Sequence, residues 1–415
     1  MRDLRIGLFL GLRQIQRANL WTTLLIIVVI LFTFLNLVAL SGILIGIVDG
    51  AMKGVRSEAI GDLTINPLDG ETRIKETERF IEELKTYPEV YSFTQRYTGL
   101  ATIEANYKER RNLSAEPDVI AVAITGIDVL AEEATTNLSK LVKEGSYLDP
   151  NESGYILIGK YNIDRYAAEF GDVFDSLKNV YPGDSVMVTV GDQSREFIVK
   201  GIVESKVDLV SVSVFIPELE FKRMFDRADY NANQIAVKLK AGYDEKVVRD
   251  QLQKSDLVKL AEIHSFTEDV PKFIIDVRKT FDILGVFTGA IGLIVASITI
   301  FIVIFINALS RRRQIGILKA VGITRRTIEY AYITQAAFYA IIGSILGILI
   351  TYYVLIPYFN QNPIDFPFSN ASLSISLEGM YIRAGALLVV TLIAGFVPAW
   401  MITRQNTLNS ILGRK

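Results

Sequence analysis

Four long apolar stretches dominate the hydrophobic pattern of the chain. They cover residues 21–48, 280–309, 328–355 and 379–402. An α-helix needs roughly 20 apolar residues to cross a bilayer, and each stretch exceeds that length. The pattern therefore predicts an integral membrane protein with four transmembrane helices.

A long segment of mixed polar and apolar character, residues 49–279, separates the first span from the second. Alternation, turn residues and helical spacing predict an order of strands and helices along it. We expect strands at 119–127, 155–159, 185–190, 196–203, 215–217 and 234–239. We expect helices at 77–84, from 160 to Phe170, at 218–225 and at 243–253. The repeated order of strand and helix predicts small α/β lobes.

Residues 1–20 form a basic amphipathic segment before the first span. On a helical wheel Leu4, Leu8, Leu12 and Ile15 share one face, and Arg2, Arg13 and Arg17 lie opposite. This pattern predicts a helix at the cytoplasmic surface of the membrane. A signal peptide is the alternative, but the following apolar run is too long and has no clear cleavage site.

Basic residues gather in the segments that we place in the cytoplasm. The loop at 310–327 begins with three consecutive arginines, and the tail at 403–415 is also basic. The loop at 356–378 has no Lys or Arg. Short loops rich in Lys and Arg remain cytoplasmic. We therefore predict cytoplasmic termini and an extracytoplasmic domain at 49–279.

The loop after the arginines has a second property. Its apolar positions are Ile315, Leu318 and Val321. Gly316 and Ala320 lie one helical turn apart, so we expect a short helix with a smooth face that another protein can approach. Gly322 can end this helix in the left-handed conformation, and Thr324 can cap the next one. A basic turn without a partner is the alternative, and it leaves the apolar face unexplained.

Small residues also recur within the spans. Gly285, Gly289 and Gly292 lie on roughly one stripe of the second span, and Gly343 and Gly347 form a pair in the third. Such stripes let helix backbones approach closely, which predicts helix packing there. The alternative is that glycine is simply frequent in membrane spans.

Composition limits the chemistry. The 415-residue chain is 50% hydrophobic and 22% charged, which fits membrane spans plus a water-soluble domain, and its net charge of -2 does not favour nucleic acid. With no cysteine and one histidine, His264, we expect no metal site and no catalytic residues. No P-loop sequence for ATP occurs. Spans nearly free of charged residues argue against ion-coupled transport and intramembrane proteolysis.

The loop sequence resembles the cytoplasmic coupling loop of the FtsX-like permease family. Ile315, Gly316, Lys319, Ala320 and Gly322 match the family pattern, whereas Gln314 replaces its usual acid. The outer region resembles the MacB-type periplasmic core domain of the same family. The matching pieces are Tyr155–Gly159, Pro182–Asp184, Phe215–Pro217 and Gln234–Lys238. The family includes macrolide-exporter, lipoprotein-releasing and cell-division ABC permeases.

The resemblance implies a type VII ABC permease of the cytoplasmic membrane. A separate ATPase would carry ATP and Mg and would bind the loop, and this chain would hold no cofactor. The implied coupling residues are Arg313, Gln314, Ile315, Gly316, Leu318, Lys319, Ala320 and Gly322. Two permease chains, identical or different, would pair through their first and second spans. Besides membrane lipid, a lipoprotein, lipopeptide or other amphiphile would be handled at the outer domain.

Two alternatives remain open at this stage. A cell-division type of the family would use the same coupling to activate an extracellular cell-wall hydrolase. An anchored α/β receptor without an ATPase would need no apolar face in the loop at 310–327.

Overall fold

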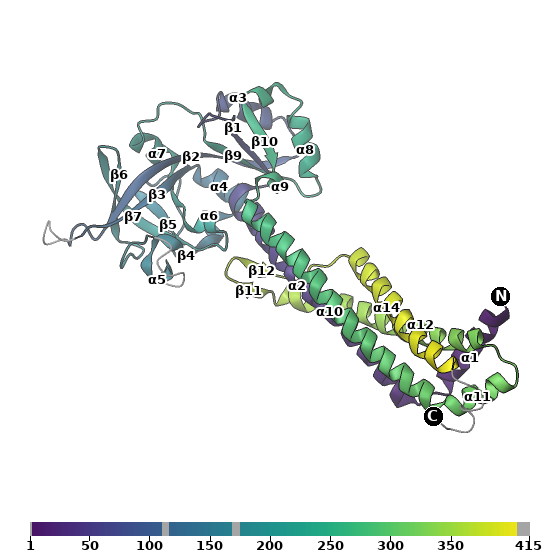
Figure 1. The fold of residues 1–415 in the computed structure, drawn as a ribbon. Helices are drawn as coiled ribbons and strands as arrows, with labels where there is room; N and C mark the ends of the chain where they lie inside the picture. Colours follow the sequence, from purple (N-terminus) through teal and green to yellow (C-terminus); the bar gives the residue numbers. More distant parts are fainter. Residues whose placement is uncertain (1, 110–115, 168–174, 405–415) are drawn as a thin grey trace. The chain divides into compact units, whose positions relative to one another are not determined.

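The computed structural model of the chain describes residues 2–109, 116–167 and 175–404. Contacts divide it into two compact units. The membrane unit comprises residues 1–49, 276–365 and 370–415, and the outer-domain unit comprises residues 50–275 and 366–369. Figure 1 shows the elements of both units.

The membrane unit is a bundle of helices. Its elements are α1 (Arg2–Gln16), α2 (Leu20–Gly54), α10 (Lys272–Ser310), α11 (Arg312–Ala320), α12 (Arg325–Ile350), the π-helix η6 (Thr351–Leu355), α13 (Ile356–Gln361) and α14 (Leu377–Thr403). Four helical segments of the described chain are long and apolar enough to cross a membrane, namely 20–60, 272–310, 325–361 and 377–403. The predicted fold class, four membrane helices with an α/β domain, is confirmed.

The helices are longer than the apolar stretches from which we predicted them. Helix α2 passes the predicted end at residue 48 and continues as the π-helix η1 (Val55–Ile60), and α10 begins eight residues before 280. Hydropathy marks the part of a helix that contacts lipid, whereas polar residues such as Lys53 still extend the helix beyond it. Helix α14 continues through Pro398 to Thr403.

The predicted outer loop at 356–378 is partly ordered structure. It contains α13 and two short paired strands, β11 (Ile364–Phe366) and β12 (Ser369–Ala371). Of the predicted tail at 403–415, residues 405–415 lie outside the described part of the chain.

Glycines let the helices of the membrane unit approach closely. A Cβ atom on Gly343 would lie 2.6 Å from Ile30 Cγ2, and one on Gly347 would overlap the ring of Phe34. Ile30 and Phe34 on α2 are completely buried. The glycine pair of α12 therefore packs against α2, and a side chain at either position would push the helices apart.

The N-terminal helix α1 docks on α12. A Cβ atom on Gly7 would lie 2.5 Å from Tyr330 Cβ, and Gln335 Nε2 donates to Gln14 Oε1 at 2.8 Å. The predicted apolar face, which includes Leu4, Leu8 and Leu12, is exposed in this structure. Helix α1 can therefore present that face to lipid while its glycine face holds it to the bundle.

The outer-domain unit is built on one ten-stranded sheet. Its strands are β1 (Leu63–Pro67), β2 (Val90–Ala105), β3 (Asp118–Ile127), β4 (Val142–Gly145), β5 (Tyr155–Gly159), β6 (Ser185–Val190), β7 (Gln193–Val203), β8 (Val214–Pro217), β9 (Gln234–Leu239) and β10 (Ala261–Ser265). The strand order is β10-β1-β9-β2-β3-β8-β5-β7-β4, and β6 pairs with both β2 and β7. The pairings from β2 through β3, β8, β5, β7 and β6 therefore return to β2 as a closed barrel.

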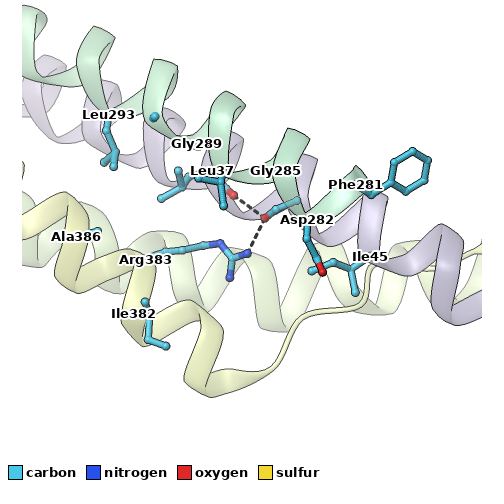
Figure 2. A pocket seen from close by; sticks show the side chains of 13 residues that line it. Leu37, Ile45, Phe281, Asp282, Gly285, Gly289, Leu293, Ile382, Arg383 and Ala386 are labelled. Atoms are coloured by element: carbon cyan, nitrogen blue, oxygen red, sulfur yellow. Dashed lines mark hydrogen bonds between the residues drawn. The ribbon is translucent and has the colours of Figure 1, made fainter. Parts of the chain in front are cut away.

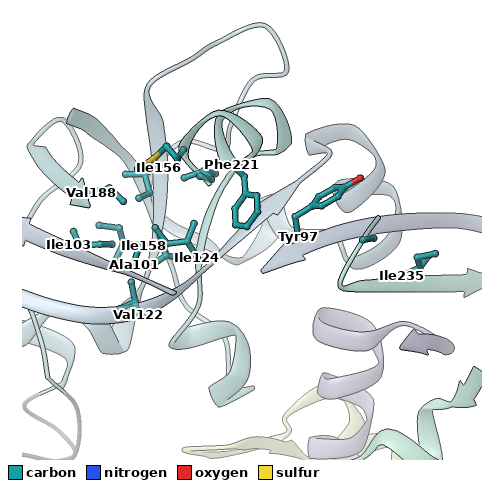
Figure 3. Packing of buried hydrophobic residues seen from close by; sticks show 14 of the residues in the cluster. Tyr97, Ala101, Ile103, Val122, Ile124, Ile156, Ile158, Val188, Phe221 and Ile235 are labelled. Carbon is teal, nitrogen blue, oxygen red and sulfur yellow. The ribbon is translucent and has the colours of Figure 1, made fainter. Parts of the chain in front are cut away.

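The 16-residue strand β2 joins two parts of this sheet. Its first half pairs with β9, which continues into β1 and β10, and its second half pairs with β3 and β6. One contiguous core runs along both halves, with Tyr97, Ile103, Ile124 and Ile235 fully buried (Figure 3). The prediction of separate small lobes is corrected, because the unpredicted strand β2 belongs to both.

Short helices cover the sheet. They are α3 (Thr77–Leu84), α4 (Val129–Thr136), α5 (Asp164–Ala167), α6 (Asp208–Ser211), α7 (Glu218–Met224), α8 (Glu245–Leu252) and α9 (Phe266–Asp269). Helix α7 packs on β2 and β3 at two glycines, which have no side chain. A Cβ atom on Gly99 of β2 would overlap Phe225, and one on Gly126 of β3 would overlap Phe221. The helix predicted to reach Phe170 appears as α5, and residues 168–174 lie outside the described chain.

A buried ion pair links β2 to α4. Arg96 Nη2 lies 2.5 Å from Glu132 Oε1, and Arg96 Nε donates to Glu132 Oε2 at 3.1 Å. Thr94 and Thr136 donate to the same carboxylate. The Glu132 side chain is only 1% exposed, so its charge depends on these donors rather than on water.

We predict that Arg96→Met lowers the stability of the full chain by about 3–5 kcal/mol, because it leaves Glu132 buried without its cation. The double variant Arg96→Met/Glu132→Met should recover most of this loss. Thermal unfolding of the full chain in detergent, followed by far-ultraviolet circular dichroism, measures both. Lys259→Ala, which breaks an exposed pair with Asp256, is the control and should change little. An Arg96→Met protein as stable as this control would contradict the prediction.

A second prediction concerns the contact between α12 and α2. Gly347→Ala should destabilise the bundle by about 1–3 kcal/mol, because the new methyl group overlaps the buried ring of Phe34. Gly385→Ala, on the exposed side of α14 with no atom within 4 Å of the new group, is the matched control. The midpoint of thermal unfolding in detergent should fall for the first variant only. Equal midpoints would show that the α12–α2 contact tolerates a side chain.

Candidate functional site

Helix α11 connects the two long membrane helices α10 and α12, and its ends have the predicted signals. Gly322 follows it with a φ of 96°, in the left-handed region that glycine adopts without strain. Thr324 Oγ1 accepts a hydrogen bond from Thr327 N at 3.2 Å and so caps α12. These two residues set a sharp boundary between α11 and α12.

One side of α11 faces the bundle. Ile315 is 5% exposed and belongs to the core of the membrane unit, and Gly316 is buried beside it. Lys319 Nζ donates to the backbone carbonyl of Thr403, at the end of α14, at 3.0 Å. Burial, together with the positive charge of Arg325, lowers the pKa of Lys319. These contacts fix α11 against the ends of the membrane helices.

The other side of α11 is exposed. Arg313, Gln314 and Ala320 lie there, and Ile317 and Val321 are 50% and 78% exposed. Ile317 and Val321 are four residues apart, so they form an apolar ridge along one face of the helix. An exposed apolar ridge next to a small residue is typical of a protein-docking surface. We call these five residues the α11 face.

The structure therefore buries some of the predicted coupling residues and exposes others. Gly316 and Ala320 do not share an exposed face, because Gly316 is buried and only Ala320 is exposed. Leu318 is half-buried. The sequence analysis overlooked Ile317, although its four-residue spacing to Val321 is visible in the sequence. The error arose because the helical phase cannot be fixed until it is known which side meets the bundle.

The glycine stripe of α10 faces α2. Cβ atoms on Gly285, Gly289 and Gly292 would lie 3.6 Å from Ser41 Cβ, 3.1 Å from Leu37 Cδ1 and 3.7 Å from Asn36 Oδ1. The distances at Gly285 and Gly292 are ordinary van der Waals contacts, and the one at Gly289 is tighter. The stripe thus brings α10 next to α2.

The π-helix η1, which follows α2, is bonded to its neighbours within the outer-domain unit. Within η1, Arg56 pairs with Asp62 at 2.5 Å, and Glu58 Oε2 accepts from Ser205 Oγ at 2.6 Å. The carbonyl of Ala59 accepts from Arg96 Nη1 at 2.5 Å. The last carbonyls of a helix have no partner inside it, so Arg96 satisfies one that would otherwise be buried unpaired.

The start of α10 is held in a similar way. A capping box between Ser265 and Glu268 begins α9, immediately after β10. Asp269 accepts from Asn66 Nδ2 at 2.9 Å and contacts His264 Nδ1 at 2.7 Å. Val270, just before α10, is 4% exposed. His264 thus belongs to the bonded segment that precedes α10.

Within the described ranges, no group of three or more His, Asp and Glu side chains is placed to hold a metal ion. The strongly paired carboxylates of the outer domain, such as Glu132 and Glu144, have Arg or Thr partners that hold them in the fold.

Comparisons with known proteins agree with these features. Residues 286–407 match the family model "FtsX-like permease C-terminal". The macrolide export ATP-binding/permease protein MacB of Campylobacter jejuni is 26% identical over 254 residues, which cover 57% of this chain and 38% of that protein. An uncharacterized ABC transporter permease of Methanocaldococcus jannaschii is 24% identical over 218 residues, half of each chain.

Among solved structures, the periplasmic region of MacB from Actinobacillus actinomycetemcomitans aligns with 15% identity and a TM-score of 0.37. The alignment covers 55% of this chain and 97% of that one. The chain spans between about two fifths and half of the length of the two curated relatives named above. The family match contains α11, α12 and α14, the elements that build the α11 face and its support. Residues 286–407 are thus an FtsX-like permease C-terminal domain, and the chain as a whole is similar to permeases of the MacB type.

Proposed function

We propose that this chain is the membrane subunit of an ABC machine and is driven by a separate cytoplasmic ATPase that docks on the α11 face. The exposed ridge of Ile317 and Val321 carries the proposal, because an apolar ridge in a basic loop otherwise has no role. The ATPase would bind ATP and Mg, and this chain would contribute no catalytic residue. A second permease chain, identical or different, would complete the machine.

Two continuous helices would transmit the movement. Helices α2 and α10 have 35 and 39 residues, so each is more than about 50 Å long at 1.5 Å per residue, well beyond the bilayer core of about 30 Å. Both helices continue into the outer-domain unit, since α2 runs to Gly54 and on into η1, and α10 starts at Lys272. A displacement at α11 would reach that unit along these two helices.

The outer domain would lie outside the cytoplasmic membrane, with both termini inside, and would handle a lipoprotein, lipopeptide or other amphiphile. The charge pattern of the loops supports this orientation. The alternative function, activation of a cell-wall hydrolase, would use the same movement of α2 and α10. The proteins that co-purify with the chain distinguish the two functions. Affinity capture from native membranes followed by mass spectrometry tests the proposal. Capture without any P-loop ATPase, under conditions in which a known ABC complex survives, overturns it.

We predict that Ile317→Glu and Ala320→Leu each uncouple the ATPase without unfolding the chain, because both side chains are exposed on the α11 face. Truncation or charging of a docking contact typically costs about 1–4 kcal/mol, so retention of the ATPase should fall at least tenfold. Co-purification and ATP turnover in proteoliposomes measure the loss.

Tyr358→Glu is the control for this pair, because Tyr358 is 59% exposed on α13, away from the α11 face. It should retain the ATPase at the wild-type level. If Ile317→Glu and Ala320→Leu both leave complex formation and turnover intact, the α11 face is not the docking surface.

A further prediction tests the orientation of the chain. The sequence has no cysteine, so a single introduced thiol reports one position. Leu100→Cys in the outer domain and Val321→Cys on the α11 face are both highly exposed sites. A membrane-impermeant maleimide should label the first in intact cells and the second only after the membrane is opened. Labelling of Val321→Cys in intact cells would reverse the proposed topology.

A further inference from the structure

A cavity of about 520 Å³ lies between helices α2, α10 and α14 of the membrane unit (Figure 2). Its volume is within the range of sites that hold small molecules. Most of the wall is apolar, formed by Leu37, Ile45, Leu293, Ile382 and Ala386 among others. Two charged side chains, Asp282 and Arg383, also line it.

Arg383 is half-buried within the fourth membrane helix. Its Nη2 donates to Ser41 Oγ at 2.9 Å and its Nη1 donates to the carbonyl of Gly379 at 3.1 Å. Ser41 in turn donates to the carbonyl of Leu37 at 2.8 Å, which fixes its orientation. In the described part of the chain, the hydrogen-bond partners of Arg383 are therefore neutral, and no carboxylate pairs with it.

An arginine in a membrane span is costly unless an anion or water compensates its charge, and such residues mark functional sites. The guanidinium group has five N–H donors, so the bonds to Ser41 and Gly379 leave donors for a ligand. A guanidinium fork binds phosphate by two parallel hydrogen bonds. Arg383 is thus placed to bind a phosphate in an otherwise apolar cavity.

Asp282 gives the cavity a second, opposite charge. It lies on α10 and is exposed at the wall of the cavity. A purely anionic headgroup would be attracted by Arg383 and repelled by Asp282. A headgroup with a phosphate next to an ammonium group satisfies both residues.

We propose that this cavity binds one phospholipid whose headgroup carries a phosphate and a primary ammonium group, as phosphatidylethanolamine does. Arg383, oriented by Ser41, binds the phosphate, and Asp282 binds the ammonium group. The first part of an acyl chain lies against the apolar wall at Leu37 and Leu293. The site goes beyond the proposed function and does not depend on it, because a chain without an ATPase partner would still carry it.

The glycines of α10 keep the cavity open. A Cβ atom on Gly285 would lie 3.6 Å from Ser41 Cβ, so a side chain fits there without displacing the backbone. A leucine at this position would occupy space that the ligand uses. Gly385, on α14 with no atom within 4 Å of a Cβ, offers a matched position outside the cavity.

Native mass spectrometry of the full chain in mild detergent tests the proposal, with phosphatidylethanolamine, phosphatidylcholine and phosphatidylglycerol of identical acyl chains as probes. The wild-type protein should retain phosphatidylethanolamine best. Arg383→Gln should lower the retention of all three lipids, and that of phosphatidylethanolamine at least about tenfold. Asp282→Asn should lower the retention of phosphatidylethanolamine to that of phosphatidylcholine. Gly285→Leu should reduce binding, whereas Gly385→Leu should leave it unchanged.

Equal lipid retention by wild-type protein and Arg383→Gln would overturn the proposal and leave Arg383 a purely structural residue. A preference for phosphatidylglycerol that Asp282→Asn does not alter would overturn the assignment of the headgroup. If Arg383→Gln does not fold, Asp282→Asn decides, because its side chain is exposed and makes no contact on which the bundle depends. A failure to capture an ATPase would leave this result unaffected.

Discussion

The hydrogen bond from Arg96 to the carbonyl of Ala59 is the interaction on which the packing of η1 within the outer-domain unit depends. A helix end leaves carbonyl groups unpaired, and burying one of them without a donor is costly. Arg96 supplies that donor, and Glu132 neutralises the charge that Arg96 brings into the core. The end of η1, β2 and α4 therefore form one bonded cluster within the outer-domain unit.

In the membrane unit, glycines, which have no side chain, hold neighbouring helices in close contact. Lipid is as apolar as leucine, so helices associate there through close contact rather than through the hydrophobic effect. The glycine stripe of α10 and the pair on α12 both face α2, which places α2 between two close neighbours. Because α11 is tied to the core by Ile315 and to α14 by Lys319, a force on its exposed face acts on the bundle as a whole.

Much of this organisation could be predicted from the sequence, because its causes are local. Span length, the left-handed Gly322 and the cap at Thr324 all follow from residue chemistry within one helical turn. The strand β2 was missed because its apolar positions are interrupted by Thr, Gln and Arg, and their burial depends on partners far along the chain. The exposed side of α11 could not be known for the same reason, since it is set by contacts with α14.

The orientation of Arg383 could not be predicted from its position near the start of a membrane helix. Six residues after the start of α14, Arg383 resembles an arginine that extends its charge to the membrane surface. The structure instead directs it inward, where Ser41 of α2 holds it beside an apolar cavity. A residue needed only for anchoring would keep its charge in water, so the inward orientation requires a compensating group. Asp282 lines the same cavity and adds a negative charge to it, and this pair of opposite charges favours a zwitterionic ligand over a simple anion.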